Sequence, residues 1–202
     1  MATKEEIVKG FRVRELLEAT RRVIARNGFQ GTTIDRVAEE AKVAKGTIYL
    51  YFPTKEDLLH AAILEGLRAM VSETAEADNP ELPPLERISE LVRNQFRIQS
   101  SNEHFLKAFF LESSFVNFEP GDVRGEELRR VYIDHLEFLA SVLGLAIRAG
   151  VLRPTDPQFA AFMLSDMITA SIRRRLLGLA STPIEADADA VLEMFLKGVL
   201  AP

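Results

Sequence analysis

The 202-residue chain predicts an all-α fold, with a three-helix, helix-turn-helix head at residues 1–54 and a larger helical body at 55–202. Apolar residues recur at helical spacing in nearly every segment, about nine in all, and no segment alternates apolar and polar residues as a strand does. Proline and glycine clusters separate these segments. Hydrophobic residues make up 47% of the chain and charged residues 27%, as is usual for a soluble globular protein.

The composition also bounds the function. The chain has no cysteine, which excludes disulfides and zinc–thiolate sites and suits a reducing compartment. The longest apolar stretch, Phe138–Ile147, is far short of the roughly 20 residues that a membrane helix needs, so we expect a cytoplasmic protein without a membrane partner. The net charge is −5, yet residues 1–60 carry eleven basic against nine acidic side chains. A mildly basic head on an acidic body suits local contact with phosphates.

The first two helices are predicted from apolar stripes and their end signals. The first runs from about Phe11 to Asn27, where Asn27-Gly28 forms a C-terminal stop. The second begins after Thr33, whose hydroxyl suits an N-cap. Its buried face has the spacing i, i+3, i+4, i+7 and comprises Ile34, Val37, Ala38 and Ala41.

A third, shorter helix begins near Ala44 or Lys45, with Ile48 and Phe52 as its inward pair. Pro53 ends it, because the residue before a proline is pushed out of helical geometry. Thr54 and Asp57 resemble a capping box that opens a fourth helix, which extends to about Ala77. Further helices are predicted at about 84–100, 103–116, 125–149, 157–179 and 185–200, and Gly150 is expected to stop the helix at 125–149.

The second and third segments have helix-turn-helix proportions, with the first helix as a brace. Small or polar residues near the start of the third helix would let it read bases in the DNA major groove, and these are Lys45, Gly46 and Thr47. The hydroxyls of Tyr49 and Tyr51 suit phosphates, as do Lys55 and the free N–H groups at the start of the fourth helix. The alternative is a three-helix packing unit in which Tyr49 is structural and Lys45 only a solvated charge.

Residues 13–63 resemble the DNA-binding domain of the TetR family of bacterial transcriptional regulators. The resemblance is carried by Gly28-Phe29, Thr32-Thr33-Ile34, Gly46-Thr47-Ile48-Tyr49, Tyr51-Phe52 and Lys55-Glu56-Asp57-Leu58-Leu59. It implies DNA contacts from Thr33, Lys45, Gly46, Thr47, Tyr49, Tyr51 and Lys55. Two positions depart from the family pattern: Ala44 replaces a serine cap, which weakens the start of the third helix, and Tyr51 replaces a common histidine.

For the body, the resemblance implies a ligand cavity and a dimer made by the last two helices. Each of these helices has an apolar stripe, and the dimer-interface candidates are Phe162, Met163, Val191, Leu192 and Phe195. The alternative is that the stripes only complete the core of each subunit. A phenylalanine cluster at 105, 109, 110, 115 and 118 suits an apolar cavity or a core. The ligand-pocket candidates are Phe105, Phe109, His135, Phe138 and Asp166. Asp166 lies within an apolar stripe and His135 beside Phe138, so we expect both polar side chains to lie inside. There they would be satisfied core polar groups or, as the alternative, groups that fix a ligand.

Enzyme functions fit the sequence poorly. The three histidines (60, 104 and 135) lack metal-ligand spacing, and we find no Gly-rich phosphate loop or nucleophile elbow, so we predict no catalytic residue, metal or cofactor. We expect a homodimeric repressor that leaves a palindromic operator when it binds a partly apolar small molecule. The alternatives are a small-molecule binder or scaffold with a vestigial DNA head, and a transcriptional activator.

Overall fold

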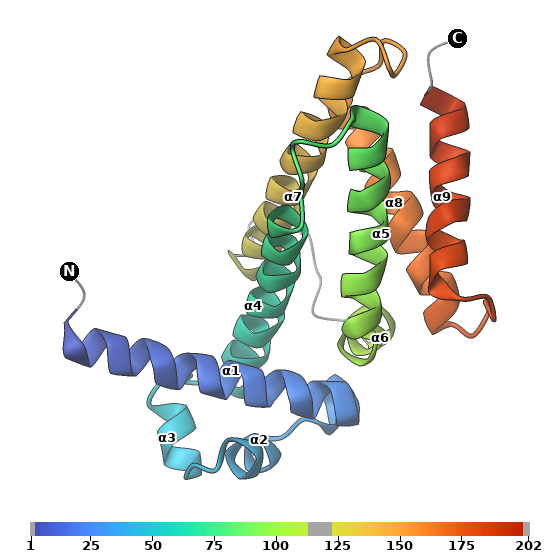
Figure 1. Ribbon diagram of the computed structural model, residues 1–202. Helices are drawn as coiled ribbons and strands as arrows, with labels where there is room; N and C mark the ends of the chain where they lie inside the picture. Colours follow the sequence, from blue (N-terminus) through green and yellow to red (C-terminus); the bar gives the residue numbers. More distant parts are fainter. Residues whose placement is uncertain (1–2, 113–122, 200–202) are drawn as a thin grey trace. The chain divides into compact units, whose positions relative to one another are not determined.

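The computed structural model describes residues 3–112 and 123–199, and these are helical throughout apart from short connections. They contain α1 (Lys4–Gly31), α2 (Ile34–Ala41), α3 (Lys45–Tyr49), α4 (Lys55–Glu76), α5 (Pro84–Ser101), α6 (Glu103–Glu112), α7 (Val123–Arg148), α8 (Pro157–Leu176) and α9 (Ile184–Val199) (Figure 1). The all-α prediction is confirmed. No helix in the described ranges is both long and apolar enough to cross a membrane.

The residues form two compact units. The first unit is Met1–Arg68 with His104–Leu128, and the second is Ala69–Glu103 with Arg129–Pro202. This division by packing differs from the functional boundary after Thr54, which stays a prediction.

α1 begins earlier than the sequence pattern predicted. Thr3 and Glu6 form a capping box, in which the Thr3 hydroxyl accepts from Glu6 N–H and the Glu6 carboxylate accepts from Thr3 N–H at 2.7 Å. The turns before Phe11 expose Ile7 and Val8, so they have no buried apolar stripe from which they could be predicted. At the other end, Gly28 has a φ of 68°, which breaks the helix as expected, but one further helical turn follows it.

Within the first unit, α1 braces α2. Buried Leu16, Val23 and Ile24 form the apolar face of α1. On the outside, Arg22 Nε donates to Glu40 at 2.7 Å and Arg26 pairs with the same carboxylate, which lowers the pKa of Glu40. Two arginines on one carboxylate fix the orientation of α2 on α1.

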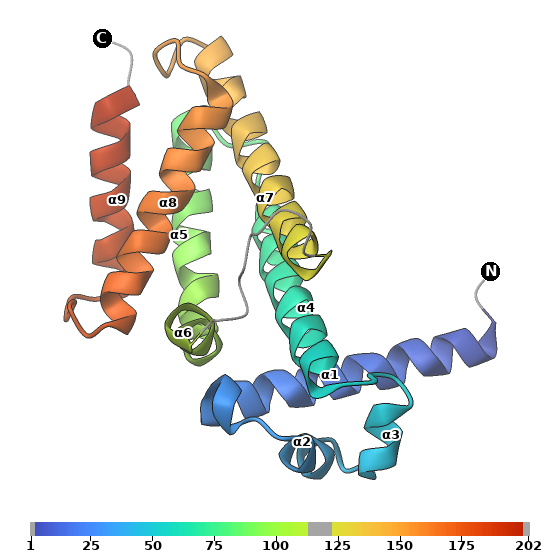
Figure 2. The same ribbon diagram turned by 180° about the vertical axis from the view of Figure 1, so that it is seen from behind.

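In the second unit, α5 packs against α8 and α9, as Figures 1 and 2 show from opposite sides. Gly150, with a φ of 71°, ends α7 as predicted. The entry to α5 is held by Arg87 and Asp78, whose two hydrogen bonds measure 2.8 and 2.7 Å and lie mostly out of solvent.

The arginines at the end of α8, which as a run of three would be expected to be only a solvated helix end, include two that bind a buried carboxylate. Arg174 and Arg175 donate to Asp187 of α9, which is only 3% exposed and also accepts from Thr182. Burial opposes ionisation of Asp187, but the hydrogen bonds from Arg175 and Thr182 outweigh it and lower its pKa. These ion pairs join residues on either side of the connection between α8 and α9, and helical periodicity does not predict pairs of that kind.

Candidate nucleic-acid interface

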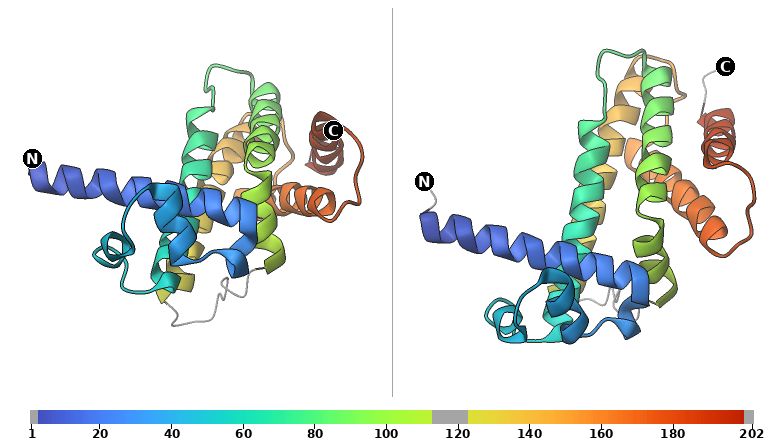
Figure 3. Two further views of the ribbon diagram at one scale, coloured as in Figure 1. Left: turned by 90° about the horizontal axis from the view of Figure 1, so that it is seen from below. Right: turned by 60° about the horizontal axis from the view of Figure 1, so that its bottom comes forward.

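The helix-turn-helix is formed by α2 and α3 of the first unit. Figure 3 shows the pair with α1 from two further directions, with α3 at the outer edge of the group. Thr33 caps α2 by accepting from Arg36 N–H at 3.3 Å, and Ile34, Val37 and Ala38 are buried. The turn between the helices is made by Lys42 in the left-handed conformation, with a φ of 55°. A lysine there is unusual, because a side chain makes this conformation costly.

α3 divides cleanly into an inner and an outer face. Ile48 is fully buried and Phe52 nearly so, which confirms that they pack inside. Lys45, Gly46 and Tyr49 are exposed, and Thr47, Tyr51 and Lys55 are half-buried. Leu50 is 81% exposed, so it does not serve the core. The residues proposed to face bases therefore lie at the surface of one short helix.

Gly46 has no packing role within this fold. A Cβ added there would meet no atom of the described residues within 4 Å, and its φ is not positive. Neither a turn nor a close internal neighbour therefore requires a glycine at this position. A backbone that comes close to an external partner would account for it.

Lys45 is paired in the free protein. Its ammonium group forms an ion pair with Asp35 of α2, and both side chains are mostly exposed. Ala44, the residue before it, makes no side-chain cap, in line with the weaker helix start expected from the sequence. A phosphate or base that binds Lys45 therefore competes with one carboxylate.

The start of α4 lies directly after this face and is tightly fixed. Thr54 and Asp57 form the predicted capping box: Thr54 Oγ1 donates to Asp57 Oδ2 at 2.6 Å and accepts from Asp57 N–H at 3.0 Å. Arg124 of α7 donates to Asp57 Oδ1 at 2.6 Å. Hydrogen bonds from Thr54 and Arg124 lower the pKa of Asp57. Lys55 lies in the same first turn, so its backbone position is well defined.

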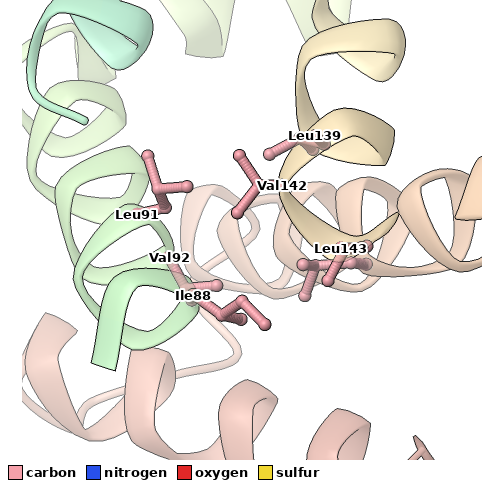
Figure 4. Close-up of a pocket in the computed structure, with 7 residues that line it drawn as sticks. Ile88, Leu91, Val92, Leu139, Val142 and Leu143 are labelled. Carbon is pink, nitrogen blue, oxygen red and sulfur yellow. The ribbon is translucent and has the colours of Figure 1, made fainter. Parts of the chain in front are cut away.

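A small apolar cavity lies inside the second unit, between α5, α7 and α8. It holds about 210 Å³ of empty space, part of it open to solvent, and Figure 4 shows side chains of α5 facing those of α7 across it. Its lining is entirely apolar and comprises Ile88, Leu91, Val92, Leu139, Val142, Leu143 and Leu164. This is the kind of lining that small-molecule sites have.

The predicted ligand-pocket residues do not line this cavity. Phe105 belongs to the first unit, where its ring lies against Gly66 of α4: a Cβ there would be 3.1 Å from Phe105 Cζ. Phe109 stacks edge-on with Phe110, at 5.3 Å between ring centroids. Phe115 and Phe118 lie outside the described residues.

The other pocket candidates belong to the second unit, and their environments differ. Asp166 is exposed, and it accepts a hydrogen bond from Tyr132 at 3.1 Å, so the expectation that it lies inside is wrong. Burial, followed by the charge of Asp166, raises the pKa of Tyr132. Phe138 is half-buried. His135 is hydrogen-bonded to buried Gln95 of α5, a residue that the sequence pattern did not single out.

The two apolar stripes predicted for the dimer differ in burial within the subunit. Phe162 and Met163 of α8 are exposed, together with Phe159. Val191, Leu192 and Phe195 of α9 are buried within the subunit, where α9 packs against α5. Their assignment to an intermolecular interface is therefore corrected. The face that α9 leaves exposed has small residues and a methionine at four-residue spacing: Ala186, Ala190, Met194 and Gly198.

The fold and its exposed α3 define a helix-turn-helix transcriptional regulator. The model of the family described as "Bacterial regulatory proteins, tetR family" matches residues 16–62. The HTH-type transcriptional regulator BetI of Rhizobium meliloti is 30% identical over 186 residues, which cover 90% of this chain and 85% of that protein. The chain belongs to the TetR family of bacterial transcriptional regulators, and it is a DNA-binding regulator.

Two further proteins are similar over nearly their whole length. The fatty acid metabolism regulator protein of Bacillus subtilis is 23% identical, covering 92% of this chain and 94% of the relative. A solved structure of a Clostridium perfringens protein assigned as a fatty acid metabolism regulator has a TM-score of 0.73 at 26% identity, covering 93% of this chain and all of the other.

Proposed function

We propose that the protein is a homodimeric repressor that leaves a palindromic operator when it binds a small molecule with a fatty acyl chain. The observation that carries the DNA-binding part is the outer face of α3. Lys45, Gly46 and Tyr49 are exposed on that face. The packing of the described residues does not require a glycine at position 46, so an external partner accounts for it.

The roles in DNA binding follow from position on the head. Lys45, Gly46 and Thr47 face bases, since they begin the short helix that enters the major groove. Tyr49, Tyr51 and Thr33 face phosphates, and so does Lys55 at the start of α4. In a dimer, two heads read successive major grooves about 34 Å apart.

The dimer is best supported at the exposed faces of α8 and α9. Phe159, Phe162 and Met163 of α8 form an exposed apolar stripe, and Met194 of α9 is 70% exposed. Exposed apolar clusters of this kind mark protein interfaces. The small residues Ala186 and Ala190 would let a partner helix approach α9 closely. Two such helices from each subunit make a four-helix bundle.

The effector class is supported by the cavity and by the relatives. Within the part of the chain that the structure describes, the residues that line the space between α5, α7 and α8 are all apolar, which suits a hydrocarbon chain. Two relatives similar over nearly their full length are named or assigned as fatty acid metabolism regulators. An effector would release DNA if it binds more tightly to a state in which the spacing of the two heads does not match the operator. The coupling free energy between effector binding and DNA binding would be about 1–3 kcal/mol.

The test is fluorescence anisotropy with labelled DNA fragments from upstream of the protein's own gene. We expect tight binding of one fragment, and release on addition of lauroyl-CoA but not of coenzyme A. Light scattering should report two chains bound per operator. A protein that binds every fragment equally, or none, would contradict the proposal.

A further inference from the structure

Buried Gln95 of α5 and half-buried His135 of α7 form a polar pair inside the second unit. Gln95 is only 4% exposed, and its Nε2 lies 2.9 Å from His135 Nε2. The amide nitrogen of glutamine is only a donor, so His135 Nε2 accepts this hydrogen bond. In a neutral imidazole the remaining proton is then on Nδ1. Gln95 therefore fixes His135 in the Nδ1–H form.

The Nδ1 atom of His135 is buried and has no hydrogen-bond partner among the residues that the structure describes. A buried donor that is left unpaired costs about 1–3 kcal/mol. Native structures contain few such groups, and each calls for an explanation. Burial lowers the pKa of His135 to about 4, so the ring is neutral near pH 7. The site therefore offers an N–H donor without a positive charge, which suits a neutral oxygen acceptor better than a carboxylate that must itself be desolvated.

The polar pair lies at the next helical turn beyond the cavity on both of its main walls. Gln95 follows Leu91 by four residues on α5, and His135 precedes Leu139 by four residues on α7. Four residues are about 6 Å along a helix and return to the same face. Leu91 and Leu139 both line the cavity. The cavity is thus lined by apolar side chains, and the polar pair lies one helical turn beyond its lining on both helices.

The size of the cavity restricts its occupant. The 210 Å³ of space within its outline includes open solvent, so the enclosed room is small and an occupant must push α5 and α7 apart. A narrow, unbranched chain fits such a space with the smallest displacement of α5 and α7, whereas a ring system requires more. An apolar chain that ends in a neutral oxygen acceptor matches both the lining and the unpaired donor.

We propose that His135 is a ligand-recognition residue, whose Nδ1–H donates to the carbonyl oxygen of an acyl effector while the unbranched chain occupies the cavity between α5, α7 and α8. Gln95 acts through His135, as the positioning residue that fixes its tautomer. The inference rests on the proposed effector-released function and names the atom that distinguishes an acyl compound from a plain alkyl one.

The test compares two ligands on the intact wild-type protein by isothermal titration calorimetry. Lauroyl-CoA has a thioester carbonyl, and S-dodecyl-CoA, the thioether with the same chain length, lacks only that oxygen. We expect lauroyl-CoA to bind about 5–10 times more tightly, since a buried hydrogen bond contributes about 1 kcal/mol. Imidazole ¹⁵N spectra should show the Nδ1–H form of His135, with its Nδ1 resonance shifted by lauroyl-CoA alone.

Two variants separate recognition from packing. His135→Phe keeps a ring of similar size and removes the donor, and we expect it to bind both ligands equally. Tyr132→Phe is the matched control: it removes a donor from the same helix, one already paired with Asp166, and should keep the wild-type preference. The wild-type comparison needs no variant, so it stands even if His135→Phe folds poorly.

The outcomes distinguish this inference from the proposed function. Equal binding of the two ligands by the wild type overturns the role of His135 and leaves the proposed function standing. A carbonyl preference without release of DNA supports the role of His135 and contradicts the effector-released repressor. If neither ligand binds, the acyl class and the role of His135 both fail.

Discussion

Gly46→Ala is expected to separate the stability of the head from its affinity for DNA. The substitution adds one methyl group at a site where nothing lies within 4 Å and the backbone is ordinary helix. Alanine in place of glycine stabilises a helix by about 0.5–1 kcal/mol. We therefore expect the thermal midpoint to stay constant or to rise by about 2–4 °C, the shift per kcal/mol for a chain of this size.

The same methyl group should weaken DNA binding, because it stands where the α3 backbone comes nearest to the bases. Losing one good base contact costs about 1–3 kcal/mol, which is about 5–150-fold in the dissociation constant. Anisotropy titrations with the operator fragment measure this, and calorimetry measures the midpoint. Gly10→Ala in α1 is the matched control, since a Cβ there also meets nothing within 4 Å.

Either of two results would refute this reasoning about Gly46. A Gly46→Ala protein that binds the operator as tightly as the wild type would show that the backbone of α3 does not approach DNA at this position. A protein destabilised by more than about 1 kcal/mol would show that the glycine serves the fold itself.

Four further predictions address other parts of the chain. Asp35→Asn removes the carboxylate that holds the lysine of α3, so DNA affinity at low salt should rise about two- to fivefold; anisotropy that shows no gain would contradict this. Asp78→Ala leaves a mostly buried arginine unpaired and should lower the free energy of unfolding by about 3 kcal/mol. A loss below about 1 kcal/mol in urea denaturation would contradict this. Phe162→Glu places a charge on the exposed stripe of α8 and should yield monomers by light scattering, whereas an unchanged dimer would exclude that face. The pKa of His135 is about 4 in the folded chain and about 6.5 in the unfolded chain, so the unfolded chain takes up its proton first as the pH falls. The free energy of unfolding should therefore fall by roughly 3 kcal/mol between pH 6.5 and pH 4. His135→Phe should lack this component when denaturation is measured across that range, and a variant that keeps it would contradict the assignment to His135.

Helix positions could be predicted because their end signals are local. The Thr54–Asp57 capping box and Gly150 act within one turn of the chain, and both appear in the structure as expected. The Thr3–Glu6 box is equally local, but the turns after it expose Ile7 and Phe11. The prediction of α1 relied on a buried stripe, so it began too late.

The direction in which an apolar face points could not be predicted in the same way. Both Phe162 of α8 and Phe195 of α9 belong to regular stripes, yet the first is 44% exposed and the second is buried. Periodicity shows that a helix has an apolar face, and only the packing of α5 decides which face is already covered. The same holds for Asp166, which lies on the exposed face of α8 together with Phe162.

The DNA-facing residues were predictable, but their electrostatic surroundings were not. Asp57 accepts from Thr54 with one oxygen and from Arg124 with the other, so a single carboxylate both caps α4 and holds the first turn of α7. These partners lie 3 and 67 residues away in the chain, and only the first forms a recognisable motif. Because Lys55 shares the first turn of α4, a displacement of Arg124 would change the charge next to Lys55 while leaving the helix cap intact. The hydrogen bond from Arg124 thus joins the start of α7 to the first turn of α4, in which the proposed phosphate contact lies.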